Sequence, residues 1–486
     1  MSSAATSPGS IAFPDDPVQH VDTTKFIGWV AMVVGMFLAI LDIQIVASSL
    51  ENIQAGLSAS PDEIGWVQTS YLIAEVVMIP LSGFLSRLIS TRWLFVASAI
   101  GFTIFSIASA CAWSIESMIW FRAAQGFLGG AMIPTVFATT YIIFPADKRN
   151  TASVMIGLIA TMAPTVGPTL GGYLTQSFSW HWLFLINVVP GMLIALVVAV
   201  TLDVDRGDRS LLRGFDLRGL LAMAAFLGSL EYVLDEGPKD DWFDERAIVY
   251  GAVICVISGL YFFRRMFTYD HPIVDLRSFR DRNFAMGCIF SFTLGIGLYG
   301  SVYILPLLLS RVRGYDSLEI GTIMAVTGIC QFISAPIAGK LTARLPARVV
   351  LGFGLALFAV GVALNGFQNS QVSFHELILP QAVRGFALMF CMLPITNLAL
   401  GTLPPEKIKN ASGLYLATMT ARYGAMGLPD PQASAMKSIV NIVTREASMI
   451  SFNDVQLAMA GIFILALLLL PLARPAGSGK PSVDAH

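Results

Sequence analysis

Runs of about twenty apolar residues recur along this 486-residue chain, separated by short polar connectors. A bilayer core roughly 30 Å thick needs about 20 apolar residues per helix, so each run predicts a membrane-spanning helix. The chain is therefore predicted to be an all-α integral membrane protein, with twelve spans up to residue 402 and one more near its C-terminus. The expected helices cover residues 26–50, 64–86, 93–112, 117–143, 151–174, 182–202, 216–235, 246–265, 284–309, 319–338, 348–367, 376–402 and 454–472.

Composition narrows the functional class. Hydrophobic residues make up 55% of the chain and charged residues 13%, and the net charge of −2 with no Lys/Arg-rich run gives no basis for nucleic-acid binding. The five scattered cysteines show no metal-ligand spacing, so we expect no metal and no cofactor. No phosphate-cradling Gly-Lys loop or nucleophile motif supports an enzyme, so the energy for any transport must come from an ion gradient.

Basic residues fall on alternate connectors. Nineteen Lys and Arg residues lie on one set of connectors, beginning with Lys25, whereas the opposite set contains four. Cytoplasmic loops are enriched in Lys and Arg, so the N-terminus is predicted to be cytoplasmic, with residues 1–25 forming a polar tail that lacks the features of a signal peptide.

Two segments recur at a nearly constant offset. The connector after the second span, from Gly83 through Arg87 to Arg92, matches the connector after the tenth span, from Gly339 through Arg344 to Arg348. Two helices later, Phe121-Arg-Ala-Ala-Gln-Gly-Phe127 parallels Pro380-Gln-Ala-Val-Arg-Gly-Phe386, with arginine and glutamine exchanged. Parallel repeats of this kind are typical of transporters whose substrate site lies between the halves.

These residues resemble the major facilitator superfamily, in particular the fourteen-spanner drug:proton antiporter branch of EmrB/QacA type. The similarity includes Leu41-Asp42-Ile43-Gln44-Ile45-Val46 in the first span, Phe121-Arg122-Ala-Ala-Gln125-Gly126 in the fourth, and the glycine-proline motif of the fifth. That motif is Ala163-Pro-Thr-Val-Gly167-Pro168-Thr-Leu-Gly171-Gly172. In the family it marks antiporters, so the resemblance implies export of hydrophobic or amphipathic compounds across the inner membrane in exchange for protons. It also implies a periplasmic adaptor and an outer-membrane channel as partners.

The resemblance implies a 6+2+6 arrangement. We expect a six-helix bundle at 26–202, two extra helices with cytoplasmic linkers at 203–282, a second bundle at 283–472 and a C-terminal tail at 473–486. Segment 411–453 departs from the family because it contains no run long enough for the thirteenth span. Either 411–428 crosses as a short distorted span, or the last helix reverses and leaves an impaired or inactive remnant of a transporter. A proton-coupled importer of a small metabolite is the remaining alternative.

Ionisable side chains inside spans are the candidates for chemistry, because each costs several kcal/mol in a bilayer. Asp42 and Arg122 are expected to pair, with protonation of Asp42 breaking the pair and driving export; a structural salt bridge is the alternative. Glu75 could carry protons or bind a cationic substrate. Glu231 is expected to reach the membrane interface, and Arg384 to bind helix-end carbonyls.

Two further groups of residues are assigned roles in conformational change. Gly167, Pro168, Gly171 and Gly172 suit a close helix contact that seals or hinges the two halves. The connectors Gly83, Arg87, Arg92 and Gly339, Arg344, Arg348 correspond to the family's gating loops. The first of these loops lacks the usual acidic residue, since Arg87 stands in its place, so its gating salt bridge is in doubt.

Overall fold

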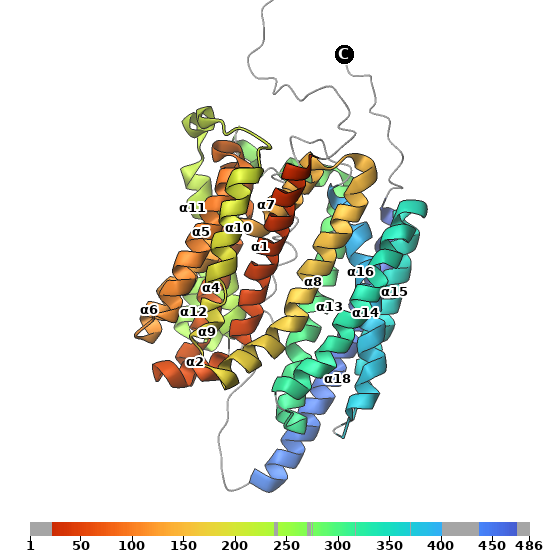
Figure 1. Cartoon of the computed structure of the whole chain (residues 1–486). Coiled ribbons are helices and arrows are strands. Elements are labelled where there is room, and N and C mark those ends of the chain that lie inside the picture. Colours follow the sequence, from red (N-terminus) through yellow and green to blue (C-terminus); the bar gives the residue numbers. More distant parts are fainter. Residues whose placement is uncertain are drawn as a thin grey trace, which may run out of the picture.

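The computed structural model describes residues 22–237, 242–269, 274, 276–315, 317–369, 371–400 and 437–473. Within these residues it contains thirteen helical segments long and apolar enough to cross a membrane. They lie side by side with their axes roughly along one direction (Figure 1). The predicted all-α membrane architecture is confirmed, and the thirteen segments coincide with the thirteen predicted windows to within a few residues at most ends.

The first half contains six spans. They are formed by α1 (Thr23–Ala47), α4 (Trp66–Ile89), α5 (Thr91–Ala110), α6 (Ile115–Gly129) with α7 (Met132–Ile143), α8 (Ala146–Ser177), and α9 (Trp182–Leu185) with α10 (Val188–Thr201). The fourth and sixth spans were expected as single helices, but each consists of two helices. Two short helices that the sequence analysis did not predict, α2 (Leu50–Leu57) and α3 (Pro61–Ile64), follow α1.

Two additional helices, α11 (Leu217–Glu236) and α12 (Arg246–Thr268), pack against each other, and α11 packs against α4 of the first half (Figure 1). An ion pair joins them at one end, where Arg265 Nε lies 2.5 Å from Asp216 Oδ1. The extra pair therefore attaches to the outside of the first half through α11.

The second half contains α13 (Arg282–Leu308), α14 (Ser317–Arg344), α15 (Ala347–Asn365), α16 (Phe374–Leu400) and α18 (Lys437–Leu469). A π-helical turn, η4 (Leu309–Arg313), continues α13. The two halves meet where α8 packs against α14 and α16.

The sequence repeat corresponds to a repeated packing contact. Gly126 lies so close to the carbonyl of Tyr71 that an added Cβ would overlap it, and Gly385 stands in the same relation to the carbonyl of Thr327. Glycine allows this close approach of two helices because it has no side chain. The two halves therefore share the same contact between their second and fourth spans.

The last helix is longer than expected, because α18 begins at Lys437 rather than near residue 454. Asn453 Nδ2 donates to the carbonyl of Gln368, just after α15, at 2.8 Å, while Leu470 lies beside Gly352 near the start of α15. Helix α18 is thus antiparallel to α15 and parallel to α16, so the end of α16 and the start of α18 lie at opposite ends of the bundle. The segment 411–428, where a short thirteenth span was considered, lies outside the described residues.

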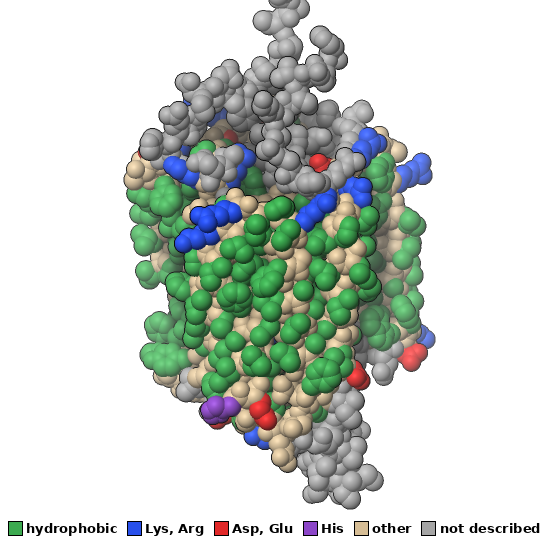
Figure 2. Space-filling model, turned by 90° about the vertical axis from the view of Figure 1, so that its right-hand side faces the viewer, with side chains coloured by type: hydrophobic (Ala, Val, Ile, Leu, Met, Phe, Trp, Pro, Cys, Tyr) green, Lys and Arg blue, Asp and Glu red, His purple; other side chains and the backbone are tan. Residues whose placement is uncertain are grey.

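The surface fits a membrane environment. Hydrophobic side chains form a broad band over the middle of the face seen in Figure 2. Lys and Arg gather above this band, at the end where α1 begins, and the acidic and histidine side chains visible in this view lie mainly near the opposite end. Such a band is expected where helices face lipid.

Candidate proton-coupling site

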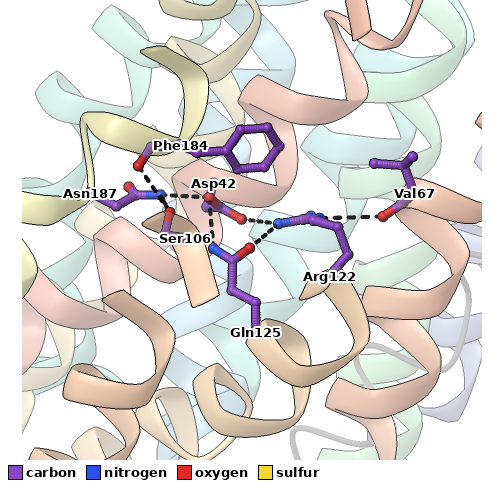
Figure 3. Close-up of polar contacts among 7 residues, drawn as sticks. All are labelled: Asp42, Val67, Ser106, Arg122, Gln125, Phe184 and Asn187. Atoms are coloured by element: carbon purple, nitrogen blue, oxygen red, sulfur yellow. Dashed lines mark hydrogen bonds and ion pairs between the residues drawn. The ribbon is translucent and has the colours of Figure 1, made fainter. Parts of the chain in front are cut away.

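Two buried charges of the first half, Asp42 and Arg122, meet inside the bundle (Figure 3). Asp42 comes from α1, Arg122 and Gln125 from successive turns of α6, and Asn187 from the break between α9 and α10. All four side chains are fully buried. The break between α9 and α10 places Asn187 where its side chain reaches Asp42 of α1.

The Asp42 carboxylate is held by three donor groups. Its Oδ2 lies 2.6 Å from Arg122 Nη1, and its Oδ1 accepts hydrogen bonds from Asn187 Nδ2 at 2.6 Å and Gln125 Nε2 at 3.2 Å. Gln125 also accepts a bond from Arg122 at 2.8 Å. The expected Asp42–Arg122 pair is therefore present, within a network that the sequence analysis did not anticipate.

The guanidinium of Arg122 has further contacts. Its Nε donates to the carbonyl of Val67 at 3.3 Å, and its central carbon lies 4.2 Å from the centre of the Tyr71 ring and 5.7 Å from that of Phe184. Its Nη2 is buried without a hydrogen-bond partner. The cation thus keeps a carbonyl and an aromatic face if the carboxylate is neutralised.

This arrangement can respond to protonation. Two charges taken out of water are tolerated when each neutralises the other, so adding a proton to Asp42 would leave Arg122 as an uncompensated buried cation. Donors from two other spans, the fourth and the sixth, hold the carboxylate, and protonation would weaken all of these contacts at once. The network can therefore couple proton binding to a movement of α1 relative to α6 and α10.

Glu75 lies on α4 near this network and is almost fully buried. It interacts electrostatically with Arg122 and with Glu231 on α11, and its carboxylate accepts no hydrogen bond from the described residues. Glu231 was expected to extend to the membrane interface, but it is only 4% exposed because α11 packs against α4. One turn further along α11, Asp235 accepts a hydrogen bond from Thr69. The extra helices therefore bring acidic side chains toward the first half.

The glycine-proline motif lies on α8 between the two halves. Helix α8 contacts α1 on one side and α14 on another. A Cβ added at Gly167 would overlap Gln44, and one added at Gly171 would overlap Ser48 and the carbonyl of Ile45. Gly172 is also buried, and Pro168 lies in the interior of the continuous helix. The small residues thus permit close approach of α8 to α1. The contact at Gln44 lies two residues along α1 from Asp42.

The first connector motif is held by the linker that follows α10. The backbone N–H of Asp208 donates to the carbonyl of Arg87 at 2.9 Å, and Arg92 lies 3.9 Å from Asp203. Asp205 accepts two hydrogen bonds from Thr91, at 2.9 Å from the backbone nitrogen and 2.8 Å from the hydroxyl. Asp203 and Asp205 of the linker therefore place carboxylates against a connector that has no acidic residue of its own.

The other residues of the two connector motifs do not contact the linker after α10 in the hydrogen bonds and ion pairs described above. Gly83 accepts a hydrogen bond from Arg87 Nε at 3.4 Å, and a Cβ at Gly339 would meet Val154 of α8 at 2.8 Å. Arg344 is exposed, and Arg348 Nε is buried without a partner. The described residues contain no group of three or more His, Cys, Asp or Glu side chains that could hold a metal ion.

The bundle and its buried ion pair define a polytopic membrane transporter built from two related helical halves. The family model of the Major Facilitator Superfamily matches residues 32–428, and the chain belongs to this superfamily. Membership identifies a transporter rather than an enzyme.

Several curated proteins are similar over most of their length. The chain is 45% identical to the colistin resistance protein EmrB of Acinetobacter baumannii, over 82% of this chain and 78% of that protein. It is 31% identical to the multidrug export protein EmrB of Escherichia coli K12, over 94% and 97%. It is 28% identical to the fatty acid resistance protein FarB of Neisseria gonorrhoeae, over 92% and 96%.

Solved structures agree on the fold. The proton:xylose symporter XylE superimposes with a TM-score of 0.65 at 14% identity, covering 93% of this chain and 96% of that chain. The human organic anion transporter MFSD10 gives a TM-score of 0.61 at 15% identity, covering 92% and 100%. At this level of identity the likeness concerns the fold alone.

Proposed function

We propose that this protein is a multidrug efflux transporter that exports hydrophobic or amphipathic compounds in exchange for protons. The observation that carries the proposal is the buried Asp42–Arg122 pair, held from α1, α6 and α10. The similarity to proteins named for multidrug export and for resistance supports the choice of substrate class.

In this mechanism the two halves rock against each other around α8. Protonation of Asp42 from the outside releases Arg122 from the carboxylate while Arg122 keeps its contacts with the Tyr71 ring and the carbonyl of Val67, and the new arrangement favours the inward-facing state. Loss of the proton to the inside restores the pair and returns the transporter to the outward-facing state with its substrate. The close contact of Gly167 with Gln44 transmits the movement of α1 to α8.

The proposal includes an inner-membrane location with a cytoplasmic N-terminus. The Lys and Arg side chains near the end where α1 begins (Figure 2) support this orientation through the positive-inside rule. Because α18 runs parallel to α16, its C-terminal end lies at the same end of the bundle as the start of α1. A periplasmic adaptor and an outer-membrane channel complete the proposed export route.

The test is extrusion of a lipophilic dye from cells whose own drug pumps have been deleted. Cells that produce the protein should extrude the dye in a manner abolished by a protonophore, whereas cells with the Asp42→Asn protein should retain it. Uptake of a labelled sugar or organic acid without dye extrusion would instead indicate an importer. A membrane-inserted protein that moves neither would indicate an inactive remnant.

A further inference from the structure

Among the described residues, one buried arginine of the second half has no acidic partner. Arg384 of α16 is 3% exposed, and its Nη2 donates to the Thr327 hydroxyl at 3.2 Å rather than to the helix-end carbonyls expected from the sequence. Thr327 donates to Gln381 at 3.1 Å, and Gln381 donates to Asn365 at 3.2 Å. Within the described part of the chain no carboxylate pairs with Arg384, so the cation is held by neutral groups.

The internal sequence repeat indicates which carboxylate the second half lacks beside Arg384. Shifting the first-half network by 259 positions carries Arg122 to Gln381, Gln125 to Arg384 and Ser106 to Asn365, all members of the second-half cluster. The same shift carries Asp42 to Ser301 on α13, which is fully buried. At this offset the second half has one guanidinium and one amide on α16, as the first half has on α6, and a hydroxyl at the sequence position matched to Asp42.

Unused hydrogen-bonding atoms remain in this cluster. Arg384 Nη1, Asn365 Nδ2 and the Ser301 hydroxyl are buried with no partner. On the neighbouring helices, the amide nitrogen and oxygen of Gln331 and those of Gln456 are also buried without a hydrogen-bond partner. Gln456 lies on α18, the last helix of its half, as Asn187 lies on the last span of the first half. The hydrogen-bonded chain from Arg384 through Thr327 and Gln381 to Asn365 thus carries unused donors at both of its ends, on Arg384 and on Asn365.

We propose that Arg384 and Asn365, with Ser301 at the position that the repeat matches to Asp42, bind the carboxylate of an amphipathic organic acid. A guanidinium fork matches a carboxylate geometrically, and a ligand that brings the counter-charge relieves the cost of a buried unpaired cation. Apolar surroundings favour an acid with a hydrocarbon body over an inorganic anion. One turn before Ser301, Gly297 lies against the stacked rings of Phe358 and Phe463, whose centres are 4.4 Å apart.

This site deepens the proposed export function by naming a substrate class, but its test requires only binding. The thermal stability of the purified protein is measured with octanoate, with the neutral isostere octanamide, and with sodium chloride at equal ionic strength. Octanoate should stabilise the wild-type protein, whereas octanamide and chloride should not. Equal stabilisation by octanamide or by chloride would overturn the assignment.

Three variants sharpen the test. Arg384→Gln should weaken octanoate binding by about tenfold or more, because it removes a charge-assisted contact. Ser301→Asp places a carboxylate where the first half has one, so it should raise the thermal stability of the free protein and abolish octanoate binding. Lys340→Gln, which removes an exposed positive charge from α14, should bind octanoate as the wild type does.

The variants also cover two complications, a failure of Arg384→Gln to fold and a failure of the proposed proton coupling. If Arg384→Gln fails to fold, unchanged octanoate binding by Ser301→Asp would by itself refute the site. Octanoate should still bind to the Asp42→Asn protein, whose defect lies in the other half. Loss of transport in that variant with retained binding separates a failure of the proposed proton coupling from a failure of this site.

Discussion

Replacing Asp42 by asparagine removes the negative charge that pairs with Arg122 while preserving the shape of the side chain. Arg122 keeps the carbonyl of Val67 and the Gln125 amide, and the asparagine oxygen can still accept one bond. Removing one partner of a buried ion pair costs about 3–5 kcal/mol. Because these contacts remain, we expect the variant to lose about 2–3 kcal/mol of folding stability and still to insert in the membrane.

The effect on coupling is larger than the effect on stability. With a pH difference of about 1 unit and a membrane potential of about 100 mV, one entering proton supplies roughly 3.7 kcal/mol. That energy supports an outward concentration ratio of roughly 500-fold for a neutral substrate. Asp42→Asn cannot release and rebind this proton, so the ratio should fall to one.

The assay measures dye accumulation in inside-out vesicles at an imposed pH gradient, together with dye exchange when no gradient is present. The variant should lose accumulation against a gradient but retain exchange, because binding and rocking of the halves do not require the proton. Gradient-driven accumulation at the wild-type rate by a correctly inserted Asp42→Asn protein would refute the reasoning.

Three further predictions concern neighbouring features. Glu75→Gln should lower resistance to cationic compounds about tenfold while leaving neutral substrates nearly unaffected, since it removes a buried carboxylate that can meet a cation; equal resistance to both classes would contradict this. Gly167→Leu should abolish dye extrusion and cost about 1–3 kcal/mol in thermal stability, because its side chain overlaps Gln44, whereas a fully active variant would show that the contact is dispensable. Asp205→Ala should speed proteolytic cleavage of the linker after α10 several-fold, because it removes two hydrogen bonds to Thr91; unchanged cleavage would mean that other contacts hold the linker.

The spans could be predicted because apolar length is a strong signal. The breaks within them could not be placed. The fourth span is interrupted around Gly130 and the sixth at Asn187, where the chain stays apolar and only tertiary contacts determine the bend. Helix α18 begins at Lys437 because a helix can extend beyond the apolar window that defines a span.

Only the charged residues of the candidate site could be predicted from the sequence. A carboxylate or guanidinium within a span is costly and therefore informative, which identified Asp42 and Arg122. Asn187 and Ser106 are uncharged and cost less than an ion in a bilayer, so their hydrogen bonds to the network were not anticipated. Glu231 was misjudged because its burial depends on α11 packing against α4, which the sequence pattern does not specify.

The central claim is that proton entry drives export, and purified protein in sealed liposomes tests it most directly. Dye movement is followed after a pH jump across the liposome membrane, with and without an ionophore that collapses the gradient. The account predicts dye accumulation in the compartment from which protons leave, lost when the gradient collapses and absent with Asp42→Asn. Equal dye movement with and without the gradient would contradict it.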